Sequence, residues 1–422
     1  MAGESQFLSW RWLVVLFALT SGCTMVSLDK RSSYQFDHSF AVSNDAFRRS
    51  LDTFGNTMVG GNHAEILNNG DEVIPAMTAA IEGAKSTVDL EEYIFKNDRA
   101  GAIVAAALID AAQRGVEVRV LVDGTGSSHS WPILNRMKKA GAKVYVFHPI
   151  RLWSIYKIGR RTHRKILVVD GTVSFAGGFC IADNWLGNAR NPKEWRDIMV
   201  RATGPVSSQM QAIFSEDWTY TTGEILAGDK FYPQIAASGG IQGQAIKVMR
   251  GDSSSLAKML YYVAIQSAEK SIFIQNAYFV PDQQIRKALV QAARRGVDVR
   301  VMVPGRHIDI PLVRMASRLH YGELLEGGVK IFEYKHTMMH NKNAVIDGIF
   351  SIVGSINFDS RSLRQNAEDS FAFYDRDFAA RMEANYAADE KDCHEVTYEN
   401  WRRRGAVQRL SELVSFVFEP IY

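Results

Sequence analysis

The stretch AAQRGVEVRVLV, residues 111–122, and its near copy AARRGVDVRVMV, residues 292–303, decide the fold class of this 422-residue chain. In each copy an apolar helical pattern ends at Arg-Gly and leads directly into an alternating, β-branched strand pattern. A helix of about a dozen residues that leads into such a strand is typical of a right-handed crossover between parallel strands. The sequence therefore predicts an α/β fold made of two copies of one unit.

Other stretches repeat in the same order. AIEGAKSTVDLEEYIF (80–95) parallels AIQSAEKSIFIQNAYFV (264–280), and MKKAGAKVYVFHP (137–149) has its counterpart in LLEGGVKIFEY (324–334). In the first copy we expect helices near 72–84 and 100–114 and strands near 87–95 and 116–122. Internal repetition of this kind indicates two lobes of the same architecture, each an α/β sandwich, packed face to face.

The repeat also sets the expected domain boundaries. A Gly-, Ala- and Ser-rich stretch between the copies is typical of a linker. We expect an N-terminal segment and extension at 1–56, a first lobe at 57–220, the linker at 221–245, a second lobe at 246–400 and a basic, amphipathic helix at 401–422.

Composition excludes several classes of protein. With 46% hydrophobic residues the chain can bury a large core, and a net charge of +3 is far from that of a dedicated nucleic-acid binder. The three cysteines, Cys23, Cys180 and Cys393, are odd in number and scattered. A disulfide framework and a paired-cysteine zinc site are therefore not expected.

The N-terminus is directed to a membrane in our interpretation. Residues 12–28, WLVVLFALTSGCTMVSL, carry no charge and are flanked by basic residues. The stretch is at the lower length limit for a spanning helix, and it equally fits a secretory signal, with LTSGC similar to a lipoprotein signal that would place lipid on Cys23. A plain hydrophobic N-terminal helix is the alternative.

A histidine and a lysine recur at equivalent places in the two copies. THRKILVVDG (162–171) contains His163, Lys165 and Asp170, and MHNKNAVIDG (339–348) contains His340, Lys342 and Asp347. Side chains two apart on a strand share a face, so each histidine projects with its lysine. The aspartates have the opposite parity and precede glycine, which predicts that they brace a hairpin turn.

Two histidines with two lysines suit phosphodiester chemistry. A neutral imidazole is a nucleophile, and a second, protonated imidazole can donate to a leaving oxygen. Two ammonium groups fit two phosphate oxygens and can stabilise the developing charge without a metal. Because each half supplies one pair, we expect the site at the interface between the lobes, with a phosphohistidine intermediate and with neither metal nor cofactor.

These motifs resemble the phospholipase D superfamily, whose signature is a duplicated His-x-Lys-x-x-x-x-Asp, and more closely the bacterial cardiolipin synthases. The supporting stretches include EEYIF (91–95), GGFCIADNW (177–185), WRD (195–197), NAYFVPD (276–282), GSINFDSRS (354–362) and NAE (366–368). The resemblance implies two tandem phospholipase D-like α/β/α sandwich lobes related by pseudo-twofold symmetry.

The resemblance also implies roles for individual residues. His163 would be the nucleophile and His340 the general acid, with Lys165, Asp170, Lys342 and Asp347 completing the two catalytic motifs. Gly177, Gly178, Ser355 and Asn357 would bind substrate, and Asp197 and Glu368 would orient the histidines; ordinary surface acids are the alternative for these two. Relatives usually have Gly-Gly-x-Asn where this chain has Cys180, which removes an amide from the first half-site.

Two further segments suggest an anionic lipid surface as a partner. RLWSIYKIGRRTHRK (151–165) interleaves basic and aromatic residues, which suits a membrane surface, a nucleic-acid channel or a solvated loop. In the tail, Leu410, Leu413, Val414 and Val417 share one helical face, and we expect this face to pack on the core rather than to insert into a membrane.

The leading interpretation is a phosphatidyltransferase of the bacterial cell membrane that makes cardiolipin from phosphatidylglycerol. A phospholipase D-type hydrolase is the nearest alternative, because water and a lipid hydroxyl compete for one intermediate. A nuclease of the same superfamily is third, and nucleic acid is not the partner we expect. A catalytically silent scaffold would be expected to lack one histidine or lysine, and both pairs are present.

Overall fold

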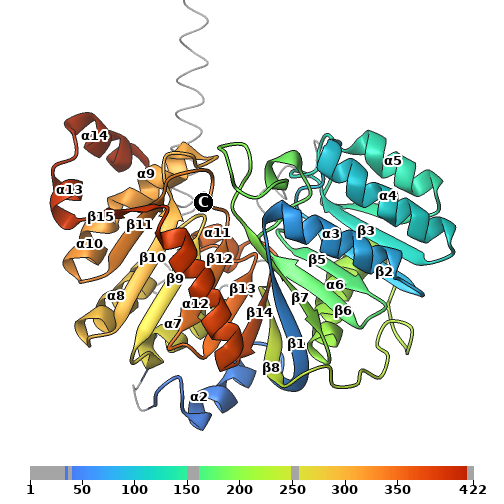
Figure 1. Ribbon diagram of the computed structural model, residues 1–422, viewed down its shortest axis with the longest axis horizontal. Helices are drawn as coiled ribbons and strands as arrows, with labels where there is room; N and C mark the ends of the chain where they lie inside the picture. Colours follow the sequence, from blue (N-terminus) through green and yellow to red (C-terminus); the bar gives the residue numbers. More distant parts are fainter. Residues whose placement is uncertain (1–33, 37–39, 150–160, 249–255, 416–422) are drawn as a thin grey trace, which may run out of the picture. The chain divides into compact units, whose positions relative to one another are not determined.

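The computed structural model describes residues 34–36, 40–149, 161–248 and 256–415 (Figure 1). From Phe36 onward the chain forms one compact unit. The apolar stretch 12–28 lies outside the described residues, so its membrane-directed interpretation stays a prediction. None of the helices in the described ranges combines the length and the hydropathy that a membrane crossing requires.

A continuous fifteen-stranded sheet runs through the described residues in the order β15-β11-β10-β9-β12-β13-β14-β8-β1-β7-β6-β5-β2-β3-β4. The strands of the first half are β1 Val59–Asn68, β2 Thr87–Glu92, β3 Glu117–Asp123, β4 Lys143–Phe147, β5 Lys165–Val169, β6 Val173–Gly177 and β7 Ile198–Thr203. Those of the second half are β8 Ile241–Val248, β9 Ser271–Asn276, β10 Asp298–Pro304, β11 Lys330–Tyr334, β12 Lys342–Ile346, β13 Phe350–Gly354, β14 Glu368–Tyr374 and β15 Cys393–Val396.

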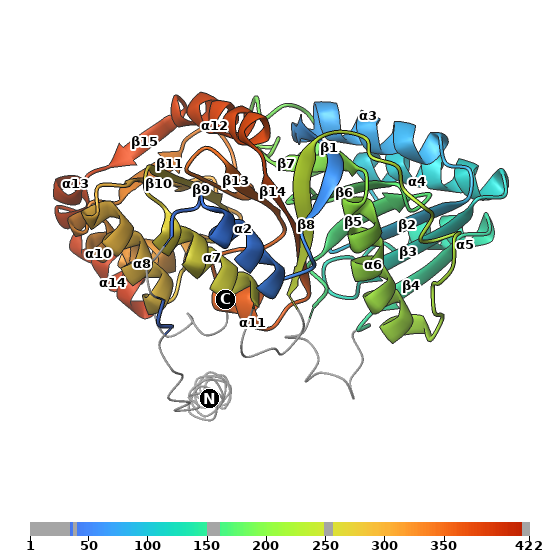
Figure 2. The same ribbon diagram turned by 90° about the horizontal axis from the view of Figure 1, so that it is seen from below.

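The strand order confirms the predicted duplication. Read outward from the middle, the first half runs β1-β7-β6-β5-β2-β3-β4 and the second runs β8-β14-β13-β12-β9-β10-β11, with β15 added at its edge. The halves join where β1 and β8 pair antiparallel, with Val59 opposite Gly243 and Asn62 opposite Ile241. Figures 1 and 2 show these two strands side by side between the lobes.

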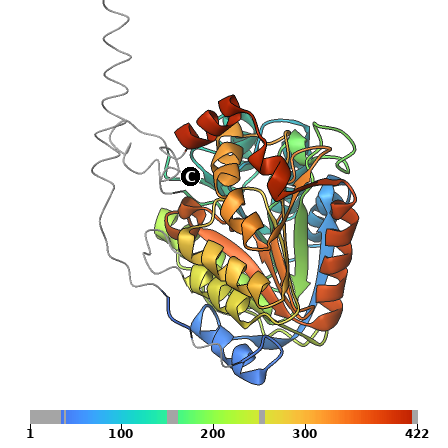
Figure 3. The same ribbon diagram turned by 90° about the vertical axis from the view of Figure 1, so that its left-hand side faces the viewer.

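Helices cover both faces of each half-sheet. The first lobe contains α3 Asn69–Glu82, α4 Arg99–Gln113, α5 Trp131–Lys139, η3 Asp183–Trp185 and α6 Val206–Thr222. The second lobe contains α7 Leu256–Ser267, α8 Gln283–Arg294, α9 Pro311–Leu319, α10 Tyr321–Glu326, α11 Ser360–Arg364, α12 Arg376–Glu390, α13 Tyr398–Arg402 and α14 Ala406–Ser415. In the second lobe, α7 and α8 lie on one face of the sheet and α12 on the other (Figure 3).

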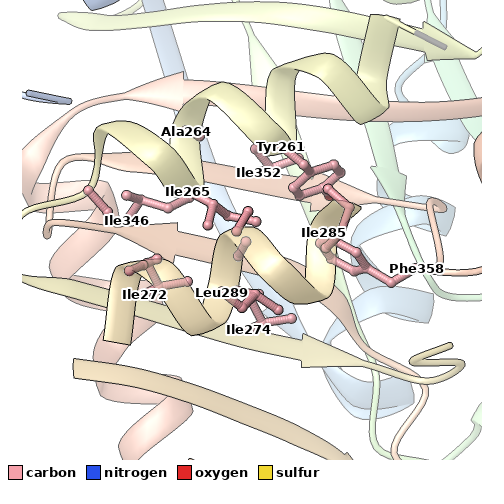
Figure 4. Packing of buried hydrophobic residues seen from close by; sticks show 14 of the residues in the cluster. Tyr261, Ala264, Ile265, Ile272, Ile274, Ile285, Leu289, Ile346, Ile352 and Phe358 are labelled. Carbon is pink, nitrogen blue, oxygen red and sulfur yellow. The ribbon is translucent and has the colours of Figure 1, made fainter. Parts of the chain in front are cut away.

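The central strands are buried on both faces, as their unbroken apolar runs require. In β5, Leu167 and Val169 belong to the core beneath α3 and α4, while Ile166 and Val168 face the opposite side. The core of the second lobe is equivalent, with Ile272 and Ile274 of β9 packed beneath α7 and α8 (Figure 4).

A third core joins the lobes. It combines residues of α6, such as Phe214, with residues of α12, such as Phe378, and with strand residues of both halves, among them Val200 and Phe371. Burial of a sizeable aromatic side chain contributes about 1.5–3 kcal/mol, so this shared core holds the two lobes as one body.

The boundaries differ from the sequence prediction at three places. Strand β8 begins at Ile241, inside the expected linker. The start of this strand was not predicted because Gly243 interrupts its alternating pattern. The extension before the first lobe forms α2 (Asp45–Ser50) and η1 (Leu51–Thr53), and its Phe47 packs against Phe350 in the core of the second lobe with ring centroids 5.3 Å apart. The third difference is the C-terminal helix.

The expectation that the apolar face of the tail packs on the core is wrong. In α14, Leu410, Leu413 and Val414 are 63%, 61% and 51% exposed. The helix instead buries Glu412, whose carboxylate accepts hydrogen bonds from Arg404 and Arg318. Charge pairing, which a hydrophobic periodicity does not register, therefore decides which side of the helix faces inward. Val417 lies outside the described residues.

Candidate active site

The two histidines lie at equivalent places, just before the strands β5 and β12. The backbone amide of His163 donates to the carbonyl of Ala367 at 2.8 Å, and that of His340 donates to the carbonyl of Arg196 at 2.7 Å. Both contacts cross from one lobe to the other, and each forms an isolated parallel bridge. The backbone of each histidine is therefore fixed by the opposite lobe.

The residue after each of these carbonyls supplies a carboxylate to the same histidine. Nδ1 of His163 lies 2.8 Å from Oε2 of Glu368, and Nδ1 of His340 lies 2.8 Å from Oδ2 of Asp197. A carboxylate that accepts from Nδ1–H holds the imidazole in the tautomer whose Nε2 is unprotonated. Each lobe thus orients the imidazole of its partner lobe.

Burial governs the protonation of this cluster. It lowers the pKa of His163 well below the usual value, and the ammonium groups of Lys165 and Lys342 lower it further. Burial and Lys342 also lower the pKa of His340, whereas Asp197 acts in the opposite direction. Burial raises the pKa of Glu368 to about 7. The cluster favours a neutral, nucleophilic His163.

Both lysines are buried beneath the histidines. Nζ of Lys165 donates to the carbonyl of His163, and Nζ of Lys342 donates to the carbonyl of His340, each at 2.6 Å. Nζ of Lys342 also lies 3.0 Å from Nδ1 and 3.1 Å from Nε2 of His340. An ammonium group has three donors, so Lys165 in particular keeps donors for a bound anion. Burial lowers the pKa of Lys342 to about 8. Beside Lys165, across the β2–β5 pair, burial raises the pKa of Glu92 well above its usual value.

Both histidines line one pocket of about 230 Å³ at the lobe interface. The ring of Tyr93 lies edge-on to His163 with centroids 4.8 Å apart, and the ring of Trp185 lies edge-on to His340 at 5.2 Å. The remaining wall includes Arg161, Cys180, Trp195, Tyr278, Asn357, Asp359, Arg361 and Asn366. Both imidazoles therefore border the same cavity.

Comparison with known proteins identifies the family. The family model described as "Cardiolipin synthase, PLD-like domain" matches residues 77–218 and again 261–389. A cardiolipin synthase of Geobacillus sp. (strain WCH70) is 36% identical over 361 residues, covering 84% of this chain and 72% of that protein. The chain belongs to the cardiolipin synthase family. The family resemblance predicted from the motifs is confirmed.

Further relatives agree with this assignment. A probable cardiolipin synthase of Bacillus subtilis (strain 168) is 34% identical over 361 residues, covering 85% of this chain and 72% of that protein. Among solved structures, phosphatidylserine synthase of Haemophilus influenzae Rd KW20 superposes with a TM-score of 0.71 at 14% identity, covering 90% of this chain and all of that one. The fold is that of the phospholipase D superfamily, and the family relationship supports a phosphatidyltransferase.

The aspartates of the two family motifs lie at hairpin turns and not in the pocket. Asp170 accepts hydrogen bonds from the backbone amides of residues 85–87, and Asp347 accepts from those of residues 269–271. Each aspartate has a positive φ, 51° and 53°, and the glycine that follows has φ of 65° or 62°. Their position agrees with the prediction from strand parity that they brace the turns, and their assignment to the catalytic residues stays a prediction.

The residues expected to bind substrate separate into two groups. Asn357 lines the pocket, with its side-chain oxygen buried and unpaired among the described residues. Ser355 instead donates to Oε2 of Glu368 at 2.6 Å. Gly178 occupies the place equivalent to Ser355, and a Cβ there would lie 2.4 Å from Oδ1 of Asp197. A Cβ at Gly177 would lie 2.5 Å from the carbonyl of residue 198. Gly178 and Ser355 therefore lie against the carboxylates behind the histidines, and Gly177 lies against the backbone of strand β7.

Cys180 takes the place equivalent to Asn357 and lines the pocket. Burial raises the pKa of its thiol to about 12, so the thiol is neutral and is not a nucleophile at physiological pH. The substitution makes the two half-sites chemically different. The first half-site contributes a weakly polar sulfur where the second contributes an amide.

Most of the basic segment 151–165 lies outside the described ranges, so its interpretation as a lipid-facing surface stays a prediction. Arg161 and Arg164, near its end, are buried. Nη1 of Arg164 lies 3.0 Å from Asp217, and Nη1 of Arg161 donates to the carbonyl of His148. These two arginines brace the loop that carries His163 and are not available to a lipid surface.

Sequence reasoning missed the aromatic wall and Arg361. Tyr93 and Tyr278 follow equivalent strands, in EEYIF and NAYFV, one position out of register with each other. Each lies beside a histidine of the two motifs, and the ring centroids of Tyr278 and His340 are 6.3 Å apart. The recurrence of a tyrosine in the two copies was a signal that the sequence offered. Trp195 and Arg361 lie inside the stretches WRD and GSINFDSRS, but the other half has asparagine at the equivalent places, Asn366 and Asn184, so no repeated residue marked them.

Proposed function

We propose that the protein makes cardiolipin by transferring a phosphatidyl group from phosphatidylglycerol through a phosphohistidine intermediate. The observation that carries the proposal is the crossed pairing of two histidines and two carboxylates around one pocket. Such pairing uses Nδ1 of both imidazoles, so each can present Nε2 to a phosphate, and Nε2 of His340 lies 3.1 Å from Nζ of Lys342. One imidazole can then act as nucleophile while the other manages the proton of the departing or entering oxygen.

In the first half-reaction, Nε2 of His163 attacks the phosphorus of the donor lipid. The bond from phosphorus to the glycerol oxygen breaks, and His340 gives its proton to that oxygen as glycerol leaves. His163 is the nucleophile because its pKa is lowered further than that of His340, which keeps its imidazole neutral. Asp197 favours the charged form of His340, which suits a general acid. Lys165 and Lys342 supply positive charge to the phosphate oxygens as the transition state forms.

In the second half-reaction, the hydroxyl of a second phosphatidylglycerol enters where glycerol left. Neutral His340 takes its proton, the oxygen bonds to phosphorus, and the phosphorus–nitrogen bond breaks to release cardiolipin and His163. Water in place of the lipid hydroxyl gives phosphatidic acid, which is the product of the alternative hydrolase function. The aromatic wall of Tyr93, Trp185 and Trp195 favours a lipid headgroup over bulk water by reducing the space open to solvent.

The test uses the purified full chain with labelled phosphatidylglycerol in detergent or vesicles. Cardiolipin and free glycerol in equal amounts are the expected products. Phosphatidic acid as the sole lipid product would replace the transferase by the hydrolase, and cleavage of nucleic acid with no action on lipid would replace both. A 32P label retained on His163 after acid-free denaturation would identify the intermediate.

A membrane surface containing anionic lipid is the partner that we propose for the exposed face of α14. Val407, Leu410 and Leu413 are 84%, 63% and 61% exposed, and basic residues at 402, 403 and 409 lie in or beside the same helix. Exposed apolar residues beside arginines suit the boundary between lipid headgroups and acyl chains. The helix packs on α9, whose preceding residue Ile310 lines the pocket.

Vesicle flotation tests this partner. The variant L410S/L413S should bind less to vesicles of phosphatidylglycerol and phosphatidylcholine, while keeping the parent's melting temperature because neither side chain is buried. I103S, on the exposed face of α4, is the control. Equal flotation of the parent and L410S/L413S would assign membrane binding to another part of the chain.

A further inference from the structure

Arg361 is a cation in the pocket whose guanidinium has no hydrogen-bond or ion-pair partner among the described residues. It belongs to α11 and lines the pocket with both histidines. Within the ranges that the structure describes, its guanidinium makes no hydrogen bond and no ion pair. The second arginine of the pocket, Arg161, differs: it donates to the carbonyl of His148 and lies 3.7 Å from Asp123. An arginine that is half-buried and unpaired suits an anion brought by a ligand.

Hydrogen-bond acceptors lie in the same wall. The side-chain oxygens of Asn357 and Asn366 are buried, unpaired in the described part of the molecule, and belong to residues that line the pocket. A buried amide oxygen without a donor is unfavourable, so a ligand with hydroxyl groups would compensate both. The wall around Arg361 therefore combines sites for hydroxyl donors with a site for an anion.

The chemistry of the second half-reaction needs this combination. On the proposed function, the leaving group of the first half-reaction is glycerol, which has hydroxyl groups and no charge. The acceptor that enters the same space also presents a glycerol, but its far oxygen carries a phosphate. The reacting phosphate already engages Lys165 and Lys342, so the acceptor phosphate needs another cation to offset its desolvation.

We infer that Arg361 binds the phosphate of the acceptor lipid, with Asn357 and Asn366 holding the glycerol that joins the two phosphates. Arg361 is then a specificity residue that favours a phosphatidyl acceptor over water or free glycerol. Asp359, the one carboxylate that flanks it in α11, accepts a hydrogen bond from the backbone amide of Ser362 as the cap of that helix. The inference rests on the proposed transferase function.

Two acceptors that share the attacking glycerol hydroxyl, but of which only one carries a phosphatidyl group, test the inference. The full chain is given phosphatidylglycerol as donor, and cardiolipin formation is measured beside the incorporation of labelled free glycerol into phosphatidylglycerol. Both reactions use the same donor, the same nucleophile and the same attacking hydroxyl. We expect R361Q to lower cardiolipin formation at least about tenfold more than glycerol exchange, since a hydrogen bond to a charged group contributes about 1.5–3 kcal/mol.

The controls separate this inference from the proposed function. R294Q removes an exposed arginine of α8 and should leave the ratio of the two products unchanged. R361K keeps the charge and should recover part of the ratio. Equal loss of both reactions in R361Q, or no loss of either, would overturn the role of Arg361. A parent protein that forms neither cardiolipin nor exchanged lipid would instead overturn the transferase function, whatever the variant does.

Discussion

The carboxylate of Glu368 lies 2.8 Å from Nδ1 of His163, although the two residues are 205 positions apart and belong to different lobes. Asp197 and His340 repeat the relationship in the opposite direction across 143 positions. Neither lobe therefore contains an oriented histidine by itself. The duplication produces one active site with two half-sites, and the lobe interface is as much a part of the chemistry as the imidazoles.

Asp197 and Glu368 each contact the histidine of the opposite lobe, and replacement of either carboxylate should reduce catalysis strongly. In D197N and E368Q the amide can donate as well as accept, so the imidazole is free to adopt the wrong tautomer. We expect kcat to fall about 10²–10⁴-fold, the usual contribution of positioned proton transfer. Cardiolipin formation is the measurement, and circular dichroism reports folding. E390Q, which changes a carboxylate on α12 remote from the pocket, is the control.

The assignment of the nucleophile can be tested with two leaving groups. H163N should abolish turnover of every substrate, because no phosphohistidine can form. H340N should slow release of glycerol about 10²–10⁴-fold but should slow release of p-nitrophenol much less, since that leaving group needs no protonation. If H340N abolishes both reactions and H163N retains p-nitrophenol release, the two histidines have the opposite roles.

Much of this architecture could be predicted from the sequence because it depends on local patterns. The helix, Arg-Gly and alternating strand at 111–122 and 292–303 correspond to α4–β3 and α8–β10. The histidines lie just before two equivalent strands, and their lysines are the first residues of those strands. The pairing of each histidine with a carboxylate of the opposite lobe could not be predicted in the same way. NAE and WRD marked Glu368 and Asp197 as partners of a histidine, but which histidine each one reaches depends on how the lobes pack.

Residues that act through packing or charge were the hardest to assign. Ser355 and Gly178 belong to motifs that suggest phosphate contact, yet both lie against carboxylates. The face of α14 that turns inward was not predicted, because it is set by ion pairs of Glu412 with Arg404 and Arg318. Arg318 is far from Glu412 in the sequence, and an apolar periodicity does not register charged residues. Hydrophobic periodicity identifies an amphipathic helix but not which of its faces is covered.

The hairpin aspartates should affect stability more than catalysis. D347A removes the acceptor for three backbone amides, and an unsatisfied buried donor costs about 1–3 kcal/mol. We expect a loss of about that size or somewhat more in the free energy of unfolding, measured with urea. The kcat of the folded fraction should stay close to the parent's. D377A, at the exposed start of α12, is the control. A large fall in kcat without destabilisation would return Asp347 to the catalytic residues.

Chelators should leave turnover unchanged. Lys165 and Lys342 supply the positive charge that a metal would otherwise bring to the phosphate, and both are buried beside the histidines. We expect the same rate of cardiolipin formation with and without EDTA, after exhaustive dialysis of the purified protein. Loss of activity in EDTA that added Mg²⁺ or Zn²⁺ restores would contradict a mechanism that uses only the lysines.

The pH profile of kcat/KM should have its maximum between about 7 and about 8. Burial raises the pKa of Glu368 to about 7, so as the pH falls through this value the carboxylate is protonated and no longer stabilises charge on His163. Burial lowers the pKa of Lys342 to about 8, so as the pH rises through this value the ammonium loses its proton and its attraction for phosphate. E368Q should remove the acid limb. K342R keeps a permanent charge and should remove the alkaline limb, at a lower maximal rate because the guanidinium is planar and larger. A profile of the parent that is flat from about pH 6 to about pH 9 would show that neither group controls turnover.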